Sequence, residues 1–543
     1  MGQMQSLPDH SVAIFRSSIA LLATAVLFGC AGLPPGANFP KQASVTLAHP
    51  EETRLGQQFA SAAHEHGEYS AFRIISAGTD GFQVRMQMIE AAERSLDLQY
   101  YIFRGDETGR MLTDQLIRAA NRGVRVRLLV DDGDTVAGDE QILRLQAYPS
   151  VEVRIFNPSS YRGHKRLLRR LEFAFNKRRL DYRMHNKLLV VDGAVALVGG
   201  RNIGNQYFQV DPESQFADDD VFTAGPIVGQ LSGAFDEFWN SDLAIPVQAL
   251  ARAGRRDTGV IARTDHVTPL AGAQPVASGE IEYASLKSGG PYAGIISGSL
   301  PLVWAHAQLV YDSPNKKKVT AGDLPGRQIA PVVIDSAREV KSELLMVTPY
   351  FIPAPDELQL LKDLRQRQVR VRVLTNSLES TTEIAAQSGY DHYRVPLLKE
   401  GVELYEIRAL LGNVRGSGQT AKVSRYGNYA LHAKMYIFDR QKLFIGSLNY
   451  DQRSKRINTE IGVIIDSAEL AQQMALRFDA MVKPANCYAV ALSPAGAPGR
   501  SPHLVWRTEK DGHDIEYTRE PARSRWQRTE VALLSLLPLD SEL

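Results

Sequence analysis

Two short stretches decide the fold: HNKLLVVD at His185–Asp192 and HAKMYIFD at His432–Asp439. Both follow the pattern HxKxxxxD, and each is followed at the same distance by a turn of small residues that ends in Asn. The turn reads GGRN at Gly199–Asn202 and GSLN at Gly446–Asn449. A lone HxK is usually a surface or core pair, but two copies with matched Asp and Asn spacing indicate one catalytic motif used twice.

A β-strand explains the spacing within each motif. Successive side chains of a strand point to opposite faces, so a His and a Lys two positions apart share a face. The glycines of the following turn let the backbone approach a ligand closely. If the two strands meet, one site contains two His, two Lys and two Asn: His185, Lys187, Asn202, His432, Lys434 and Asn449.

Such a set suits a phosphodiester substrate. One His can attack phosphorus as a nucleophile, and the other can protonate the leaving oxygen and later accept a proton. The Lys and Asn side chains, with Ser447, would stabilise the charged phosphoryl oxygens. The motif acids Asp192 and Asp439 are candidate catalytic residues, with a role in holding the fold as the alternative. No cluster has metal-ligand spacing, so we expect neither a metal ion nor another cofactor.

The sequence around the motifs repeats as well. Three strand-like apolar runs precede each motif, and helix-like stretches lie between them. This double alternation predicts an α/β fold with two homologous sandwich domains packed around one shared active site. The strand-like runs are 96–103, 123–133 and 151–158, then 344–351, 368–377 and 402–408, and the helical stretches are 84–95, 110–122 and 356–366.

The doubled motif with its G-[GS]-x-N turn resembles the phospholipase D superfamily, and further segments resemble the bacterial C-type cardiolipin synthases. Those segments are SLDLQYYIF from Ser95, RMHNKLLVVDG from Arg183, TPYFIP from Thr348 and YTREP from Tyr517. The resemblance runs from about residue 70 to the C-terminus. The chain departs from the family pattern at Asp181-Tyr182 and at Gln387, which would alter lipid preference.

The resemblance implies two covalent half-reactions. A phosphatidyl group passes to a histidine, and the glycerol hydroxyl of a second lipid then accepts it. The usual order in the superfamily makes His185 the nucleophile and His432 the general acid and base. Family members also place an acid after each motif, where it orients a histidine, and the matching positions are Asp218 and Glu460.

The N-terminus resembles a bacterial lipoprotein signal. An apolar run follows Arg16, and the junction LFGC ends at Cys30, which would become lipid-modified. A buried cysteine in an anchor helix is the alternative. We therefore expect a protein anchored by lipid to the bacterial cell membrane, with its domains on the periplasmic side; inner and outer membrane both remain open.

These patterns divide the chain. Residues 241–300 are rich in Ala, Gly, Ser and Pro with weak periodicity, which is typical of a linker. The expected parts are a signal at 1–30, a tether and lead-in at 31–69, a first phospholipase D-like domain at 70–240, the linker at 241–300, a second such domain at 301–492 and a tail at 493–543.

Charge identifies one local surface. The formal net charge is only +1, so composition provides no argument for nucleic acid as a partner. Residues 162–180, however, read RGHKRLLRRLEFAFNKRRL, and on a helix they would form a basic, apolar-faced element for an anionic membrane surface. A solvated charged helix is the alternative. We see no pattern of base-stacking aromatic residues beside it.

Three functions fit these observations. The first is cardiolipin synthase, with phosphatidylglycerol or phosphatidylethanolamine as the phospholipid donor. The second is a hydrolase with the same chemistry, either a phospholipase D or a nuclease. The third is a non-catalytic lipid-binding scaffold, which the two intact HxK pairs argue against. The first two differ only in the acceptor that reaches the phosphohistidine.

Overall fold

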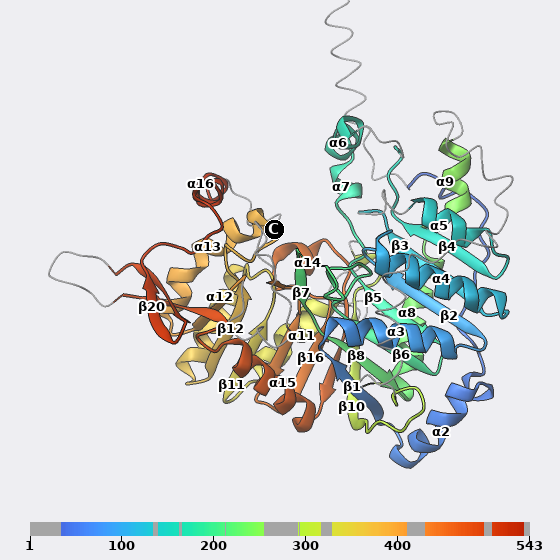
Figure 1. Ribbon diagram of the computed structural model, residues 1–543, viewed down its shortest axis with the longest axis horizontal. Coiled ribbons are helices and arrows are strands. Elements are labelled where there is room, and N and C mark those ends of the chain that lie inside the picture. The colour runs from blue at the N-terminus through green and yellow to red at the C-terminus, as the bar shows by residue number, and fades with distance from the viewer. Residues whose placement is uncertain are drawn as a thin grey trace, which may run out of the picture.

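The computed structural model describes residues 34–133, 139–161, 166–211, 213–254, 292, 294–316, 328–409, 429–493 and 502–536. Its architecture confirms the expected α/β class with two repeated halves (Figure 1). The first half runs from blue to green and the second from yellow to red, and they lie side by side. Cys30 and the rest of the signal segment lie outside the described residues.

The first half is built on one mixed sheet. Its strands lie in the order β1-β8-β6-β5-β2-β3-β4-β9, with β2, β3 and β4 parallel to one another. The HxK strand β5 therefore lies at the centre. The bounds are β1 Ser70–Ile75, β2 Ser95–Tyr100, β3 Arg125–Asp131, β4 Val151–Phe156, β5 Lys187–Val191, β6 Val195–Gly199, β8 Asp220–Ala224 and β9 Ala244–Pro246.

The second half repeats this order strand for strand. Its sheet reads β10-β17-β16-β15-β11-β12-β13-β18, extended by β19 and β20, and β10 pairs with β1 to join the two halves. The second HxK strand, β15, again lies at the centre. The bounds are β10 Val303–Tyr311, β11 Glu343–Val347, β12 Arg370–Asn376, β13 Glu403–Ile407, β15 Met435–Phe438, β16 Lys442–Gly446, β17 Ile461–Asp466, β18 Cys487–Leu492, β19 Leu504–Lys510 and β20 His513–Tyr517.

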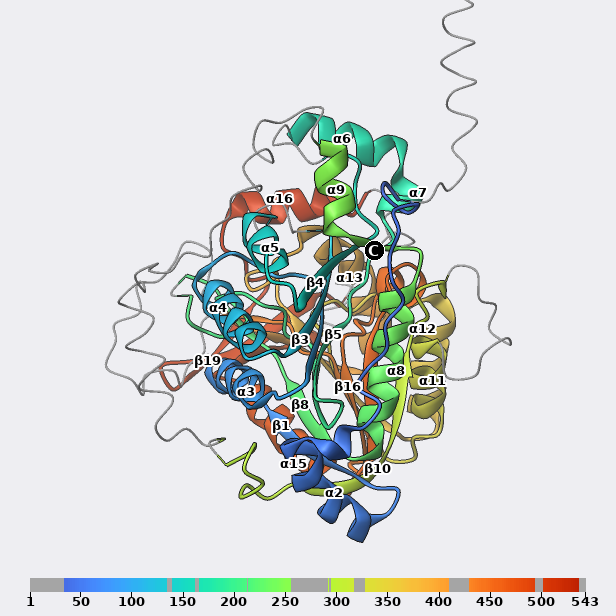
Figure 2. The same cartoon turned by 90° about the vertical axis from the view of Figure 1, so that its right-hand side faces the viewer.

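Helices cover the sheets, and the described residues form three large apolar cores besides one small cluster of Tyr207, Phe216 and Ala430. One core lies on the outer face of each sheet, and a third joins the halves through β5, β6, β15 and β16 together with α8 and α15. Figure 2 shows α6, α9 and α16 above the sheets. The bounds are α2 Arg54–His66, α3 Gly78–Ala91, α4 Glu107–Asn121, α5 Asp139–Gln146, α6 Arg166–Phe175, α7 Lys177–Leu180, α8 Pro226–Asn240, α9 Val247–Gly254, α11 Ile329–Arg338, α12 Pro355–Gln366, α13 Ile384–Lys399, α14 Gln452–Arg456, α15 Ala468–Met481 and α16 Arg525–Leu534, besides a short η1 at Pro50–Glu52.

The structure changes some sequence assignments. The helix expected at 84–95 is α3, which begins at Gly78, and Ser95 already belongs to β2. Residues 244–246, assigned to the linker, form β9 and pair with β4, because an apolar Ala-Ile-Pro segment can cover the sheet edge. Among the described residues, no helix is long and apolar enough to cross a membrane.

Candidate active site

Short backbone pairings between the halves place both histidines at the domain interface. Strand β7 (Gln215–Ala217) of the first half pairs in parallel with β14 (Tyr429–Leu431), and the His432 amide donates to the Ala217 carbonyl at 2.8 Å. The other pairing mirrors it: the His185 amide donates to the Thr459 carbonyl at 2.9 Å. Each HxK segment is thus bonded to the chain that precedes the acid of the opposite half.

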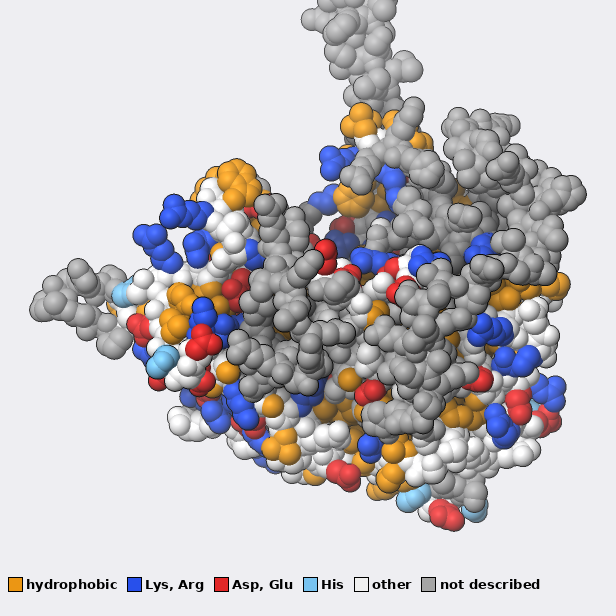
Figure 3. All heavy atoms as spheres, viewed as in Figure 1, with side chains coloured by type: hydrophobic (Ala, Val, Ile, Leu, Met, Phe, Trp, Pro, Cys, Tyr) orange, Lys and Arg blue, Asp and Glu red, His pale blue; other side chains and the backbone are white. Residues whose placement is uncertain are grey.

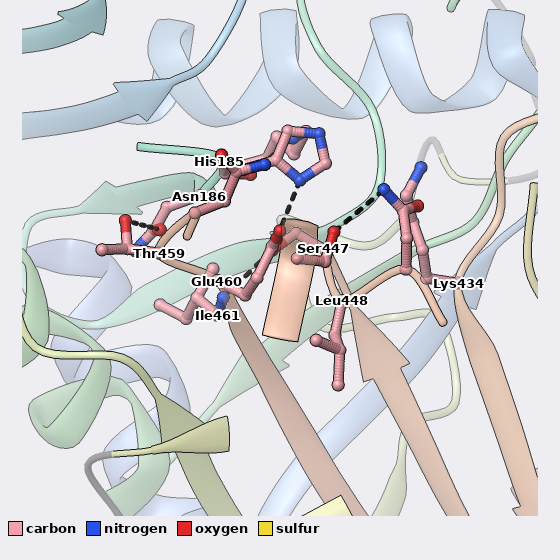
Figure 4. A network of polar contacts seen from close by, with 12 residues as sticks. His185, Asn186, Lys434, Ser447, Leu448, Thr459, Glu460 and Ile461 are labelled. Atoms are coloured by element: carbon pink, nitrogen blue, oxygen red, sulfur yellow. Dashed lines mark hydrogen bonds and ion pairs between the residues drawn. The ribbon is translucent and has the colours of Figure 1, made fainter. Parts of the chain in front are cut away.

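These pairings produce crossed His–acid contacts. The Nδ1 atom of His185 lies 2.8 Å from the Glu460 carboxylate, and Nδ1 of His432 lies 2.5 Å from the Asp218 carboxylate. Figure 4 shows His185 above Glu460, with Ser447 beside that carboxylate. A carboxylate only accepts hydrogen bonds, so it holds the proton on Nδ1 and leaves the Nε2 lone pair for chemistry.

The two lysines lie close to the histidines. The Nζ atom of Lys434 is 2.9 Å from His432 Nδ1, and Lys187 Nζ donates to the His185 carbonyl. Burial lowers the pKa of Lys434 to about 8, although nearby acids such as Asp218 and Glu460 oppose the shift. Burial also lowers the pKa of Lys187 well below its ordinary value, again against the charge of Glu460. A bound phosphate would oppose the lowering further, because it adds another anion beside the buried cations.

Both histidines favour the neutral form. Burial and then Lys187 and Lys434 lower the pKa of His185 well below its ordinary value. Burial and then Lys434 lower the pKa of His432 to about 3, although Asp218 opposes the shift. Because each histidine responds to the lysine of the other half, the four side chains share one site.

The two acids differ in charge. Burial would raise the pKa of Asp218, but His432, Lys434 and Arg201 outweigh it and hold that pKa below its usual range. Burial raises the pKa of Glu460 to about 7, although Lys187 and Ser447 oppose the shift. At neutral pH Asp218 is therefore ionised, whereas Glu460 titrates.

The turns after the motifs contact these acids differently. The Ser447 hydroxyl donates to Glu460 at 2.5 Å and accepts from the Ile461 amide at 3.0 Å. Gly200 is the matching residue of the first half, and a Cβ atom there would lie 2.0 Å from Asp218 Oδ1. The glycine is therefore required by the close approach of the carboxylate.

The two motif asparagines are buried in the same turns. Asn202 Oδ1 accepts from the Ile102 amide at 3.1 Å, whereas Asn449 Nδ2 donates to Ser454 Oγ at 3.2 Å. Each amide carries two N–H groups, so a donor remains for a phosphoryl oxygen in either half.

The structure does not bring Asp192 and Asp439 to the histidines. The Asp192 carboxylate accepts from the backbone amides of Glu93–Ser95, and that of Asp439 accepts from those of Lys341–Glu343. Both residues have φ near +53° at the hairpin turn that ends the motif strand, a conformation that Asp tolerates. Their contacts hold the fold rather than the substrate.

Several residues at the site could not be predicted from the spacing of the motifs. The Tyr101 ring meets His185 edge-on at 5.0 Å between centroids, and Phe216 stacks on His432 at 5.3 Å. Arg453 of α14 crosses the interface to Asp181 at 2.6 Å and also acts on the pKa of His185. The position of Tyr101 at the end of a parallel strand could have indicated it, but Phe216 depends on contacts between the halves.

The assembled site can therefore offer one unprotonated Nε2 to phosphorus, a second imidazole to the leaving group, and two cations to the phosphoryl oxygens. Within the described ranges, no group of His, Cys, Asp and Glu side chains could hold a metal ion.

Comparison with known proteins identifies relatives over most of the chain. A family model described as "Cardiolipin synthase, PLD-like domain" matches twice, at residues 86–239 and 333–482. Cardiolipin synthase C of Escherichia coli strain K12 is 33% identical over 498 residues, which cover 90% of this chain and 99% of that protein. The major cardiolipin synthase of Bacillus subtilis strain 168 is 26% identical over 414 residues, or 76% of this chain and 68% of that protein.

Among solved structures, the phosphatidylserine synthase of Haemophilus influenzae Rd KW20 is similar to this chain. The TM-score is 0.48 at 13% sequence identity, and the alignment covers 79% of this chain and 91% of that one.

Proposed function

The chain belongs to the cardiolipin synthases of the phospholipase D superfamily and is a phosphatidyltransferase that acts on phospholipids, and we propose that it forms cardiolipin through a phosphatidyl-histidine intermediate. The observation that supports this proposal best is the crossed pairing of His185 with Glu460 and of His432 with Asp218. Each half holds the imidazole of the other, so neither half has a complete site alone.

In the first step, His185 Nε2 attacks the phosphorus of the donor lipid. The bond from phosphorus to the headgroup oxygen breaks, and His432 gives that oxygen its proton, so the headgroup alcohol leaves. The low pKa of His185 supports its role as nucleophile, because an attacking imidazole must be unprotonated. His432 must carry a proton for this step, and Asp218 favours that form because it opposes the lowering of the His432 pKa by burial and Lys434. A bound phosphodiester anion would oppose the same lowering.

In the second step, His432 accepts the proton of a glycerol hydroxyl on a second phospholipid. That oxygen attacks phosphorus, the P–N bond to His185 breaks, and both histidines return to their starting state. Lys187, Lys434 and the donors of Asn202 and Asn449 stabilise the charge on the phosphoryl oxygens in both steps. Phosphatidylglycerol can serve as donor and acceptor, and phosphatidylethanolamine is a second donor to test.

Covalent trapping tests the assignment of the two histidines. With a donor that carries a good leaving group, protonation is less necessary, so His432→Ala should form the adduct and then stall. His185→Ala should form none, and mass spectrometry should locate the phosphatidyl group on His185 in the wild type. An adduct on His432 would reverse the two roles, and cardiolipin formation with no adduct on either would refute the two-step route.

Product analysis separates transfer from hydrolysis. Purified enzyme given phosphatidylglycerol should yield cardiolipin and glycerol. Phosphatidic acid as the main product would instead indicate a hydrolase, since water would then be the acceptor.

We also propose that the chain is held at a bilayer outside the cytoplasm by lipid on Cys30. The support is the LFGC junction after an apolar run, together with a lipid substrate that resides in membranes. Cys30→Ala should abolish incorporation of labelled fatty acid and release the protein or leave its precursor. Absence of label from the wild type would refute the lipid anchor.

A further inference from the structure

The large apolar side chains that water reaches are concentrated in two short helices. Among the described residues, twelve such side chains are exposed, and five of them lie on α6. Leu167 and Phe175, at its two ends, are 68% and 74% exposed. Leu168, Leu171 and Phe175 are spaced so that they share one face of the helix.

Helix α16 is the second helix that exposes large apolar side chains. Trp526 is 72% exposed, Leu533 is 59% exposed, and Leu536 just beyond the helix is 78% exposed. Trp526 and Leu533 are seven positions apart, which again puts them on one helical face. Burying such side chains in lipid instead of water is favourable, whereas leaving them in water requires an explanation.

Both helices rise from the same face of the molecule. Figures 1 and 2 show α6 and α16 above the sheets in two perpendicular views. In Figure 3 the orange side chains of each helix form a raised apolar cluster, and a recess lies between the two clusters. We call these apolar clusters of α6 and α16 the two caps. Blue basic side chains lie beside each cap. A flat surface could therefore touch both caps at once.

Each helix is attached to a segment that leads to a catalytic histidine. Helix α7 follows α6 directly, and its last residue, Leu180, lies only a few residues before His185. On the other side, Gln527 of α16 donates to the Leu378 carbonyl at 2.6 Å. Leu378 follows Asn376, which bonds both backbone groups of Leu431, the neighbour of His432. The two caps therefore flank the site.

The charges beside the caps favour an anionic partner. Arg170, Lys177 and Arg178 are exposed on α6 and α7, and Arg525 is exposed at the start of α16. The single acid of α6, Glu172, is directed inward, where it accepts from the Ser160 and Tyr161 amides. Basic residues next to exposed apolar ones are the pattern of helices that lie in the headgroup region of a bilayer.

We propose that α6 and α16 form one lipid-docking surface, which seats the enzyme on a leaflet containing anionic phospholipid with its active site facing that leaflet. The inference rests on the proposed function, since it supplies the route by which lipid headgroups reach the histidines. Either helix alone offers a small apolar area. Two helices anchored on opposite halves fix the orientation of the site as well.

Trp526 is itself the probe for a direct test. The full chain is mixed with vesicles of phosphatidylcholine and phosphatidylglycerol whose acyl chains carry bromine near the glycerol. Bromine should quench Trp526 fluorescence, and Trp526→Phe provides the baseline for the other tryptophans. Quenching reports on this helix even if another segment holds the chain at the membrane, so its absence in the wild type overturns the proposal.

A double substitution on the other cap tests whether the two helices dock together. Leu167→Ser with Phe175→Ser should weaken quenching of Trp526 and lower cardiolipin synthesis on vesicles by roughly tenfold. Synthesis from phosphatidylglycerol dispersed in detergent micelles should stay unchanged. Leu476→Ser, which removes an exposed leucine from α15 outside the two helices, is the control and should change neither readout.

The remaining outcomes separate the inference from its alternatives. Unchanged quenching in the α6 variant would show that the caps do not act together. Sedimentation of a dimer in the wild type and a monomer in the variants, with quenching unaltered, would assign the surface to a second copy of the chain and overturn the proposal. Quenching without cardiolipin on either vesicles or micelles would refute the proposed function and leave the docking surface standing.

Discussion

The two halves repeat the same strand order but hold their histidines with different acids. His432 is paired with Asp218, which is ionised and packed against Gly200, whereas His185 is paired with Glu460, which titrates near neutral pH. Both imidazoles favour the neutral form, but Asp218 opposes the lowering of the His432 pKa, because an ionised partner stabilises a protonated imidazole more than a partly neutral one does. The duplication thus provides two similar histidines, and the difference between their acids supports the proposal that His432 is the proton donor and His185 the nucleophile.

The largest expected difference between the halves comes from removing the charge of each acid. Asp218→Asn should lower kcat by roughly a thousandfold, because the proton donor loses its stabilising charge. The ratio of wild-type to variant activity should be constant with pH, since the pKa of Asp218 lies below the accessible range.

Glu460→Gln is the matched change and should depend on pH. The folded pKa of Glu460 is raised to about 7, so the wild-type carboxyl is neutral below that pH and charged above it. The ratio of wild-type to variant activity should therefore be small in acid and rise as the pH passes through about 7. If the ratio of wild-type to variant activity does not change with pH for either variant, the two acids do not differ in charge as described.

Exchanging the turn residues should sharpen the same comparison. Gly200→Ser places a Cβ atom where the Asp218 carboxylate lies, so it should separate Asp218 from His432 and lower kcat about a hundredfold. Ser447→Gly removes the hydroxyl's hydrogen bonds to Glu460 and to the Ile461 amide without displacing the carboxylate, and should lower kcat about tenfold. Equal losses would show that the turns are interchangeable. Circular dichroism should establish that both variants fold.

The lysines predict the alkaline limit of activity. If Lys434 binds phosphate as a cation, as proposed, kcat/KM should fall as the pH rises through about 8, the value to which burial lowers its pKa. Lys434→Arg keeps its charge to higher pH, so it should move the alkaline limb of the kcat/KM profile to higher pH, with a lower plateau value of kcat/KM. If the alkaline limb does not move in this variant, the group that titrates there is Lys187 instead.

The motif acids should affect stability rather than chemistry. Asp192 is fully buried with three backbone amides on its carboxylate, so Asp192→Ala should lower the free energy of unfolding by roughly 3 kcal/mol. Asp439 makes similar contacts near the surface, and Asp439→Ala should cost about 1–2 kcal/mol. Denaturant titration measures both, and kcat of the folded fraction should stay close to wild type. A large loss of kcat without loss of stability would return these residues to the site.

The smallest expected effect is that of a chelator. Two lysines occupy the place that a cation would take in phosphoryl transfer, so activity should not change when a chelator is added. A loss of activity that a divalent ion reverses would contradict this, and the same treatment of a known metal-dependent phosphodiesterase is the control.

The sequence by itself determined the elements that depend on local spacing. The strand-like runs recur in the observed order, and the small turn follows each motif, because the alternation of side chains along a strand is a local property. The prediction that His and Lys share a strand was wrong, since β5 begins at Lys187 and β15 at Met435, so both histidines lie just before their strands. The α/β class and the family follow from the same doubled pattern. Asp218 and Glu460 could be named from the family pattern, but not the histidine that each of them holds.

Tertiary structure alone decided the pairing and the asymmetry. Glu460 contacts His185 although more than half the chain separates them in sequence. Its raised pKa comes from burial between the two halves, which the spacing of residues in the sequence cannot predict. The placement of α16 and α6 on one face of the molecule has the same origin, since the pairing of β1 with β10 joins the two sheets. Local sequence sets which side chains share a face, whereas burial and charge arise from segments that meet only after folding.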